Sequence, residues 1–557
     1  MFVPLTRREM DTKNTTKEKT MRKHNIFAAS VLTAALAILT PAAHAATTVE
    51  VLGSGSSAMW QTAAIAAWKD LAGSGAQHYT IKGTTGCTTL PNCAQLHDSR
   101  STNIAPEGGN LWVVWNSAQT EVWAYLSVDS VVGNRAYFAQ PHAQLQIDPA
   151  AESGDAGNLI SSSLWGADAA SIPSAVYAAL NNHVVTAAFT DIRPEDAKFA
   201  QSRAVSTLNT SNYSGLGYGT GPNTLIGTSV ESAFSSAKAN PVDFNISGDD
   251  PFNTSDPIPA WTTISVGASP IVFLINRTNS AGLGRTSGAF TNITDAQAQK
   301  IFSGTECDTN ALGGSGTDVA INPVQREPIS GTMNTTEFTV FRISSAPNNS
   351  QEANVGQPTI GTSSNPLDKT CLAGGGTRRR AIGTGEMINT GVLTTKDAIG
   401  YAFFSYGNVS KIAGTSSYGY LKLDGEDPIF SSYSNGDLPT CTAPCPVSPG
   451  TSFPNLRSGK YRAWSVLRVA TDASGTNYST ASALVSAIQA NINGTVPDFV
   501  PFKAVGSDPG LKYYRSHYTQ SGVAPNNGLS GEKESGGDMG GCIEPVGPAP
   551  GVLNCHQ

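Results

Sequence analysis

Two separate stretches of this chain repeat the order strand, small-residue loop, helix, and this order restricts the possible folds more than any other feature. Residues 47–72, TTVEVLGSGSSAMWQTAAIAAWKDLA, predict a strand over 49–52, then a Gly/Ser loop and a helix. Residues 184–200, VVTAAFTDIRPEDAKFA, repeat the arrangement, with a buried strand over 184–189. Such units imply α/β layering with largely parallel sheets, in which ligands bind beyond the carboxyl ends of the strands.

The ends of the predicted helices carry capping signals. Ser56 or Ser57 is the expected N-cap of the first helix. Thr294 and Gln297 fit a capping box and Gly304 a helix C-terminus, which together predict a helix from 294 to 304. The first helix is expected to bury one stripe of residues at helical spacing, namely Trp60, Ala64, Ala67, Trp68 and Leu71.

The rest of the chain predicts further strands and two less regular segments. Apolar strands are expected within 260–277, 398–406 and 461–471. Residues 94–183 are rich in Trp and Val and predict an inserted segment that contains strands. Residues 205–260 are dominated by Gly, Ser, Asn and Pro and predict loop.

Size and charge limit the class of protein and of partner. A chain of 557 residues predicts at least two lobes, because single domains stop growing at about 250 residues. Charged residues make up 14% and the formal net charge is −7, so no broad basic surface is expected for nucleic acid or an anionic membrane. The run from Arg378 to Arg380 could be a second anion contact or a nucleic-acid patch, but three basic residues more often form a solvated loop, which is the expectation here.

Residues 21–45, MRKHNIFAASVLTAALAILTPAAHA, have the features of a secretory signal peptide. A basic start precedes an apolar run from Ile26 to Leu39, and Ala43-His44-Ala45 forms a small-x-small end. We therefore expect a periplasmic or secreted protein.

The cysteines number eight, and an even count behind a signal peptide predicts disulfides. A zinc site at CTAPC is the rival interpretation, but no histidine lies near it and the spacing is not CxxC. The simplest disulfide pattern joins neighbours in sequence: Cys87 with Cys93, Cys307 with Cys371, Cys441 with Cys445, and Cys542 with Cys555.

The stretch INPVQREPISGTMNTTEFTVF, residues 321–341, combines an arginine with an expected helix start. A helix that begins at Ser330 or Gly331 directs its first unpaired N–H groups, and its partial positive charge, at whatever lies before it. The Ser330 and Thr332 hydroxyls add donors, and Arg326 adds a planar fork that can hold two oxygens. This combination predicts an oxyanion site.

Companion turns support that interpretation. Residues 53–57 and 83–86 are small-residue turns, each after a predicted strand, and Asp191 stands in the same kind of position. A carboxylate beside an anion is repulsive unless the ligand carries a proton, as hydrogen phosphate does and sulfate does not. Asp191 would then reject sulfate by leaving two acceptors face to face.

These motifs resemble the phosphate-binding periplasmic proteins of ABC-type phosphate uptake, which have the type II periplasmic binding protein fold. The resemblance lies in Arg326-x-x-x-Ser330-Gly331-Thr332 and in the stretches VLGSGSSAMW, FTDIRPED, ITDAQAQKIFSGT and DAIGYAFFSY. It implies a two-lobed α/β fold with mixed sheets, flanking helices and a two-stranded hinge. It also implies a monomer that binds inorganic phosphate or a related oxyanion without a cofactor, and that delivers it to an ABC permease in the inner membrane.

The resemblance further implies domain limits and site residues. The expected parts are an N-terminal extension and signal peptide at 1–45, a first lobe from 46–274 and 464–557, and a second lobe at 275–463, with the insertion at about 94–183. The implied ligand-binding residues are Ser57, Thr85, Asp191, Arg326, Ser330, Gly331 and Thr332.

Two other functions are open at this stage. An exported phosphatase-like hydrolase would need catalytic groups, and His97-Asp98 is the one candidate pair, because the GxSxG, HExxH and P-loop motifs are missing. A secreted surface or matrix protein could instead reuse the fold without tight phosphate binding. We expect a binding protein and no enzyme activity.

Overall fold

The computed structural model divides the chain into Met1–Ala46 and Thr47–Gln557, and every element below belongs to the second unit. The structure describes residues 46–83, 94–97, 107–138, 141–148, 159–192, 260–285, 290–314, 317–326, 330–341, 369–381, 383–405, 415–430, 452–491, 498–511, 513–517, 541–545 and 554–555, with positions 409, 412 and 436. The signal segment, the 205–259 part of the expected loop and the CTAPC motif lie outside these ranges.

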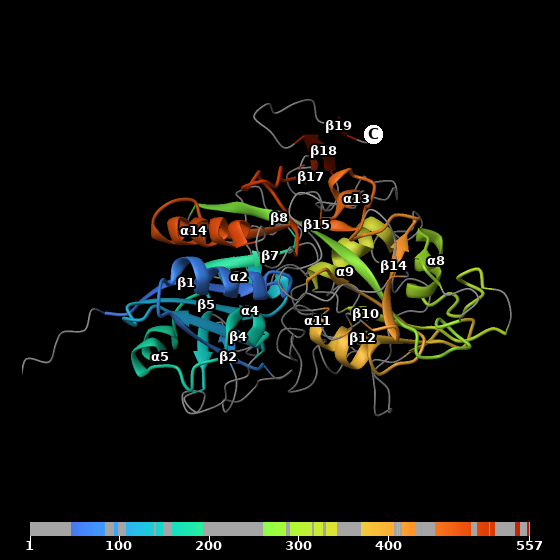
Figure 1. Ribbon diagram of the computed structural model, residues 1–557, viewed down its shortest axis with the longest axis horizontal. Helices are drawn as coiled ribbons and strands as arrows, with labels where there is room; N and C mark the ends of the chain where they lie inside the picture. The colour runs from blue at the N-terminus through green and yellow to red at the C-terminus, as the bar shows by residue number, and fades with distance from the viewer. Residues whose placement is uncertain are drawn as a thin grey trace, which may run out of the picture. The chain divides into compact units, whose positions relative to one another are not determined.

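The fold is mixed α/β, built on a 16-stranded mixed sheet with flanking helices, and the expected fold class is confirmed in these terms (Figure 1). A separate 3-stranded sheet contains β17 (Tyr513–His517), β18 (Gly541–Pro545) and β19 (Asn554–Cys555). Along the main path the order is β11 (Lys369–Thr370), β12 (Thr377–Ala381), β10 (Asn322–Arg326), β13 (Ala398–Phe403), β8 (Trp261–Asn276), β15 (Trp464–Asp472), β7 (Ala187–Thr190), β1 (Thr48–Gly55), β5 (Glu121–Ser127), β4 (Glu107–Trp115), β3 (Ala94–His97) and β6 (Gln144–Ile147). Beside this path lie β2 (Gln77–Ile81), β9 (Asn292–Ile293), β14 (Tyr418–Leu423) and β16 (Val500–Pro501).

The long strand β8 connects the two halves of this sheet. Its residues from Trp261 to Pro270 pair with β15, and those from Ile271 onward pair with β13. We call the strands from β15 to β6 the first half and those from β13 to β11 the second half. Pairing is parallel around β1 and around β10, whereas β8 is antiparallel to its neighbours, so each half is mixed rather than largely parallel.

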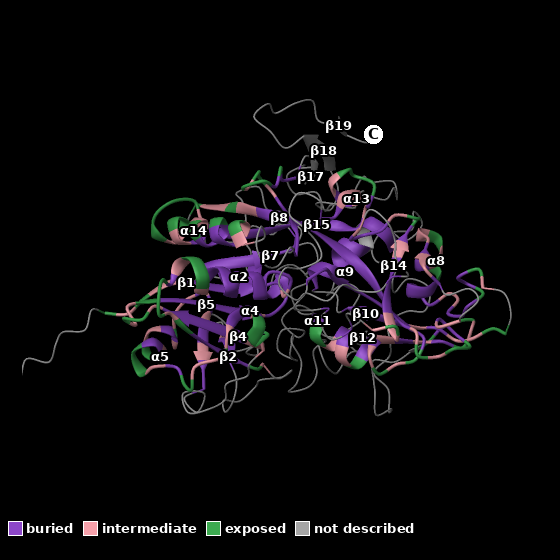
Figure 2. Ribbon diagram, viewed as in Figure 1, coloured by how far each residue is buried: buried purple, intermediate pink, exposed green. Residues whose placement is uncertain are grey.

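The helices of the first half are α2 (Trp60–Ala66) with its π-helical continuation η1 (Ala67–Leu71), α3 (Ser130–Phe138), α4 (Ser162–Trp165), α5 (Ser174–Leu180) and α14 (Thr476–Asn491). Of these, α3 packs on β1 and β7, and α14 packs on α2, β8 and β15. Every residue of α2 is buried, because α14 packs on it, so the predicted single stripe is too narrow (Figure 2). The predicted N-cap is also wrong: the helix begins at Trp60 after Met59, without a side-chain cap, because β1 and its turn extend further than expected.

The segment predicted as an insertion is integrated into the main sheet. It supplies β3, β4, β5 and β6, and β5 pairs directly with β1. Its Trp and Val residues fill the core; Trp112, Val113, Val114 and Trp115 are all buried. The segment therefore forms strands that support the carboxyl end of β1.

The second half contains the helix whose ends the sequence predicted most directly. It is α8 (Asp295–Phe302), with the Thr294 and Gln297 capping box present and Gly304 in a left-handed conformation after it. The other helical segments are α9 (Gly331–Thr336) with η3 (Glu337–Phe341), α11 (Gly383–Glu386) with η4 (Met387–Val392), and α13 (Pro454–Arg457). None of the helices within the described ranges is long and apolar enough to cross a membrane.

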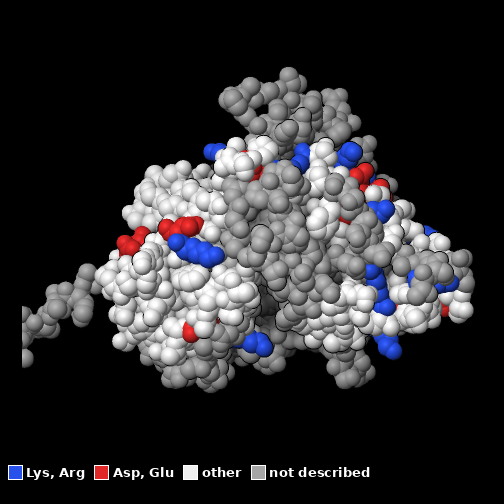
Figure 3. Space-filling view, viewed as in Figure 1, with Lys and Arg blue, Asp and Glu red and all other residues white. Residues whose placement is uncertain are grey.

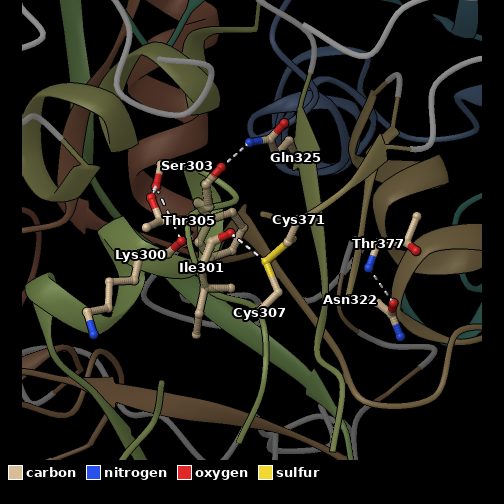
Figure 4. The surroundings of a disulfide bond; sticks show 10 residues. Lys300, Ile301, Ser303, Thr305, Cys307, Asn322, Gln325, Cys371 and Thr377 are labelled. Atoms are coloured by element: carbon tan, nitrogen blue, oxygen red, sulfur yellow. Dashed lines mark hydrogen bonds between the residues drawn. A yellow bond between two sulfur atoms is a disulfide. The ribbon is translucent and has the colours of Figure 1, made fainter. Parts of the chain in front are cut away.

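A disulfide joins Cys307 to Cys371 in the second half, which confirms one of the predicted pairs (Figure 4). Its surroundings include the end of α8 and strand β10, which are joined because the Gln325 side chain donates to the Phe302 carbonyl. Cys542 and Cys555 face each other in the register of β18 and β19, and their pairing stays a prediction. The pairs Cys87 with Cys93 and Cys441 with Cys445 lie outside the described residues.

The basic run at Arg378 is not a solvated loop. It forms β12, and the Arg378 side chain is fully buried. Arg379 donates to the Thr395 hydroxyl at 3.0 Å. Three consecutive charges do not predict a strand from local sequence. The strand forms because β12 pairs with β10, which lies far away along the chain.

Candidate functional site

The candidate site lies where several parallel strands end. In the first half, β1, β5 and β7 run parallel, and in the second half β10 and β12 do so. Parallel neighbours bring their carboxyl ends to one edge, which is where ligands bind in such sheets. The residues at these ends are Ser56 and Ser57 after β1, Asp129 and Ser130 after β5, Asp191 after β7, Arg326 at the end of β10, and Thr384 after β12.

Asp191 is buried and held by hydroxyl groups. Its side chain accepts hydrogen bonds from Ser130 and, at 3.2 Å, from Ser56. Burial raises the pKa of Asp191, while the Ser130 hydrogen bond and the positive charge of Arg326 act in the opposite direction. The net upward direction means that the site disfavours the ionised carboxylate relative to water.

Gly331 starts α9 directly against Asp191. A Cβ atom added to Gly331 would lie 1.7 Å from the Asp191 Oδ1 atom and 2.9 Å from the Ser130 hydroxyl. Only glycine lets this helix start approach the carboxylate so closely. Ser330 caps the helix, since its hydroxyl accepts from the Met333 amide at 3.3 Å. Ser330 and Thr332 are both buried.

Arg326 is buried and connects the two halves of the sheet. Its Nη2 donates to Asp129 Oδ1 at 2.8 Å, and its Nη1 donates to Thr384 Oγ1 at 3.0 Å. Its backbone amide donates to the Tyr401 hydroxyl at 3.2 Å. Asp129 belongs to the first half and Thr384 to the second, so one guanidinium contacts both.

Six of the seven predicted site residues lie within the described ranges, and all six are found at this edge of the sheet. The Ser57 hydroxyl lies 3.0 Å from Thr384 Oγ1, and the Asp191 carboxylate and Arg326 are close enough to influence each other electrostatically. Thr85 lies outside the described residues. His97, from the candidate hydrolase pair, ends β3, while Asp98 lies outside the described residues.

The prediction missed Asp129, Ser130 and Thr384. A signal was available for each, because DS in YLSVDSVVG and GTG in RRRAIGTGE both follow a strand. That signal becomes specific only when β5 is known to neighbour β1 and β12 to neighbour β10. Tyr125 was missed as well; its hydroxyl donates to the Ser56 carbonyl, and burial, with Asp191 and Asp129 nearby, raises its pKa well above the usual value.

The arrangement is rich in donors and contains two carboxylates. Serine and threonine hydroxyls and a guanidinium converge on one edge, as a site for an oxyanion requires. Because Asp129 already neutralises much of the Arg326 charge, an anion would be held chiefly by hydrogen bonds. Among the described side chains, no group of three or more His, Cys, Asp or Glu is placed to hold a metal ion. Among the residues that Figure 3 describes, most on the visible face are neither acidic nor basic, and the charged ones are scattered.

Comparison with known proteins gives distant structural matches alone. No family model matches the chain, and no curated protein matches it in sequence. A phosphate-binding protein from Stenotrophomonas maltophilia is 14% identical, with a TM-score of 0.32, over 80% of this chain and 87% of that one. A periplasmic phosphate-binding protein named PfluDING, solved with phosphate bound, is 12% identical with a TM-score of 0.31, over 80% of this chain and 90% of that one. An ABC-type phosphate transport receptor from Vibrio cholerae is 14% identical with a TM-score of 0.24, over 42% of this chain and 73% of that one.

Proposed function

We propose that this protein is an exported solute-binding protein that captures phosphate, or a closely similar oxyanion, for uptake by an ABC permease. The observation that carries the proposal is the meeting of Asp191 with Gly331 and Arg326. Asp191 and Arg326 come from strand ends in opposite halves of the sheet and are buried charges, and Gly331 begins helix α9. Buried charges are costly unless they are paired or serve a ligand, and such groups are concentrated at functional sites.

The chemistry of the residues favours hydrogen phosphate over sulfate. The amides at the start of α9 and the hydroxyls of Ser57, Ser330 and Thr332 would donate to anion oxygens. Asp191 would accept the proton of hydrogen phosphate, whereas sulfate has no proton to offer. We also propose Thr85 as a ligand-binding residue, because its turn resembles the corresponding turn of the phosphate-binding periplasmic proteins.

The domain arrangement that we propose has its lobes at 46–274 with 464–557, and at 275–463. The change of β8 partners after Pro270 and the start of β15 at Trp464 support crossings near these limits. We propose a monomer in the periplasm or outside the cell, without a cofactor and without enzyme activity. The permease would be its partner.

The test is calorimetry with inorganic phosphate on the full mature chain, after bound phosphate has been removed. We expect heat that fits micromolar or tighter binding, and Arg326→Ala should weaken it by at least about tenfold, because a hydrogen bond to a charged group contributes about 1.5–3 kcal/mol. Lys300→Ala is the matched control: it removes one exposed positive charge, which pairs with Glu306 outside the site.

Absence of heat in the wild type would favour the surface or matrix protein. Phosphomonoester hydrolysis that depends on His97 would favour the hydrolase.

A further inference from the structure

The short helix α11, which follows β12, places one hydroxyl between the two halves of the candidate site. Thr384 is buried, and its Oγ1 lies 3.0 Å from Arg326 Nη1 and 3.0 Å from Ser57 Oγ. Arg326 ends β10 in the second half, and Ser57 follows β1 in the first. Thr384 is therefore a common hydrogen-bond partner of Ser57 from the first half and of Arg326 from the second half.

The hydrogen bond between Arg326 and Thr384 has a defined direction. A guanidinium has N–H donors and no acceptor, so Thr384 Oγ1 must accept from Arg326. The Thr384 and Ser57 oxygens lie 3.0 Å apart, and either hydroxyl can donate across that distance. A hydroxyl that already accepts from a guanidinium becomes a stronger donor, which favours donation from Thr384 to Ser57 Oγ. In that arrangement Ser57 directs its own hydrogen away from Thr384. In such a chain each bond polarises the next, which strengthens the final donor.

We propose that Thr384 is a positioning residue of the anion site, an inference that rests on the proposed function. It accepts from Arg326 and donates to Ser57, and so fixes the Ser57 hydroxyl as a donor toward the bound oxyanion. The series Arg326, Thr384, Ser57 is called the hydroxyl relay here. Without it the Ser57 hydroxyl can rotate, and the Arg326 Nη1 group loses an acceptor.

The relay has a different role from that of Asp191. It supplies donors, and every oxygen of phosphate or sulfate can accept, so the relay does not distinguish the two anions. Loss of the relay should therefore weaken both anions by the same factor. A change at Asp191 should alter the ratio between them.

The main experiment compares Thr384→Val with wild type by calorimetry, using inorganic phosphate and then sulfate. We expect the Kd for phosphate to rise by at least about tenfold and the Kd for sulfate, where measurable, by the same factor. Thr384→Ser keeps the hydroxyl and should restore phosphate binding to within about threefold of wild type. Thr390→Val is the matched control, because the exposed Thr390 hydroxyl donates to the Glu386 carbonyl in the helix that follows. Thermal unfolding without phosphate reports whether each variant is folded, and Thr384→Ala replaces Thr384→Val if the latter does not fold.

A double-mutant cycle with Ser57→Ala separates a relay from independent contacts. If the two hydroxyls act in series, the double variant should bind phosphate no more weakly than the weaker single variant, within about twofold. Fully additive losses would overturn the relay, and so would wild-type affinity in a folded Thr384→Val protein. Both results leave the proposed function intact if wild type binds phosphate. Absence of phosphate binding by wild type overturns the proposed function, and the relay with it.

Discussion

At the scale of single residues, Gly331 and Asp191 are held in a contact that allows little variation. The missing side chain of Gly331 leaves the space that the Asp191 carboxylate occupies. Ser130 and Ser56 orient that carboxylate, and the sequence pattern did not identify Ser130. The chemistry of the site therefore depends on residues that lie far apart in the sequence.

Gly331→Ala tests this close approach. The added methyl group would overlap Asp191 Oδ1, so we expect loss of phosphate binding by at least about tenfold and a lower unfolding temperature, because overpacking costs about 1–3 kcal/mol. Gly385→Ala is the matched control, since nothing lies within 4 Å of the position its Cβ would take. Calorimetry and thermal unfolding measure the two effects. Normal binding by Gly331→Ala would show that α9 does not start against the anion.

Asp191→Asn tests the role of the carboxylate in reading a proton. We expect the ratio of phosphate to sulfate affinity to fall by more than phosphate affinity itself, because the amide no longer requires a proton from the ligand. Competition calorimetry at neutral pH measures the ratio. Equal loss for both anions would contradict the proton-reading role.

The raised pKa of Asp191 also predicts how the same variant changes stability with pH. A carboxyl group whose pKa is higher in the folded than in the unfolded protein stabilises the fold below the unfolded pKa, and loses that contribution as pH rises through the folded pKa. Between about pH 4 and about pH 7, without phosphate, the stability of Asp191→Asn should therefore improve relative to wild type. Denaturant unfolding across this range measures the difference, and a constant difference would contradict it.

At the scale of secondary-structure elements, the disulfide supports the strands that carry the second half of the site. Cys307 follows α8, and Cys371 lies between β11 and β12. The backbone between them is joined as well, because the Cys307 amide donates to the Ala373 carbonyl at 3.0 Å. β12 in turn pairs with β10, which ends at Arg326. The disulfide thus lies at the opposite end of these strands from the site.

Removing this disulfide should lower stability more than it lowers affinity. The bond closes a sequence separation of 64 residues, and a native disulfide contributes about 2–4 kcal/mol to the free energy of unfolding. We expect Cys307→Ser with Cys371→Ser to unfold at lower urea concentration while the folded protein keeps phosphate binding within about threefold. The single variant Cys371→Ser is unsuitable as a control because it leaves a reactive thiol. A large loss of affinity with unchanged stability would contradict this division.

At the scale of the whole second unit, Thr47–Gln557, the site depends on both halves of one sheet. β8 carries the chain from the first half into the second, and β15 begins after the chain has returned to the first half. The Arg326 to Asp129 ion pair and the Ser57 to Thr384 hydrogen bond connect the halves at the site. If these contacts form or break, the distance between hydrogen-bond donors of the two halves, such as Ser57 and Arg326, changes. A ligand that contacts both halves would stabilise the arrangement in which they meet.

The α/β class, the cap of α8, the long apolar β8 and the start of α9 at Gly331 could be predicted from the chain alone. Each of these depends on local periodicity, capping or turn chemistry, which neighbouring residues determine. The integration of β5, the burial of Arg378 and the roles of Asp129, Ser130 and Thr384 were decided by tertiary structure. They depend on which strands become neighbours, a choice made by packing between residues far apart in sequence, and no local pattern encodes it.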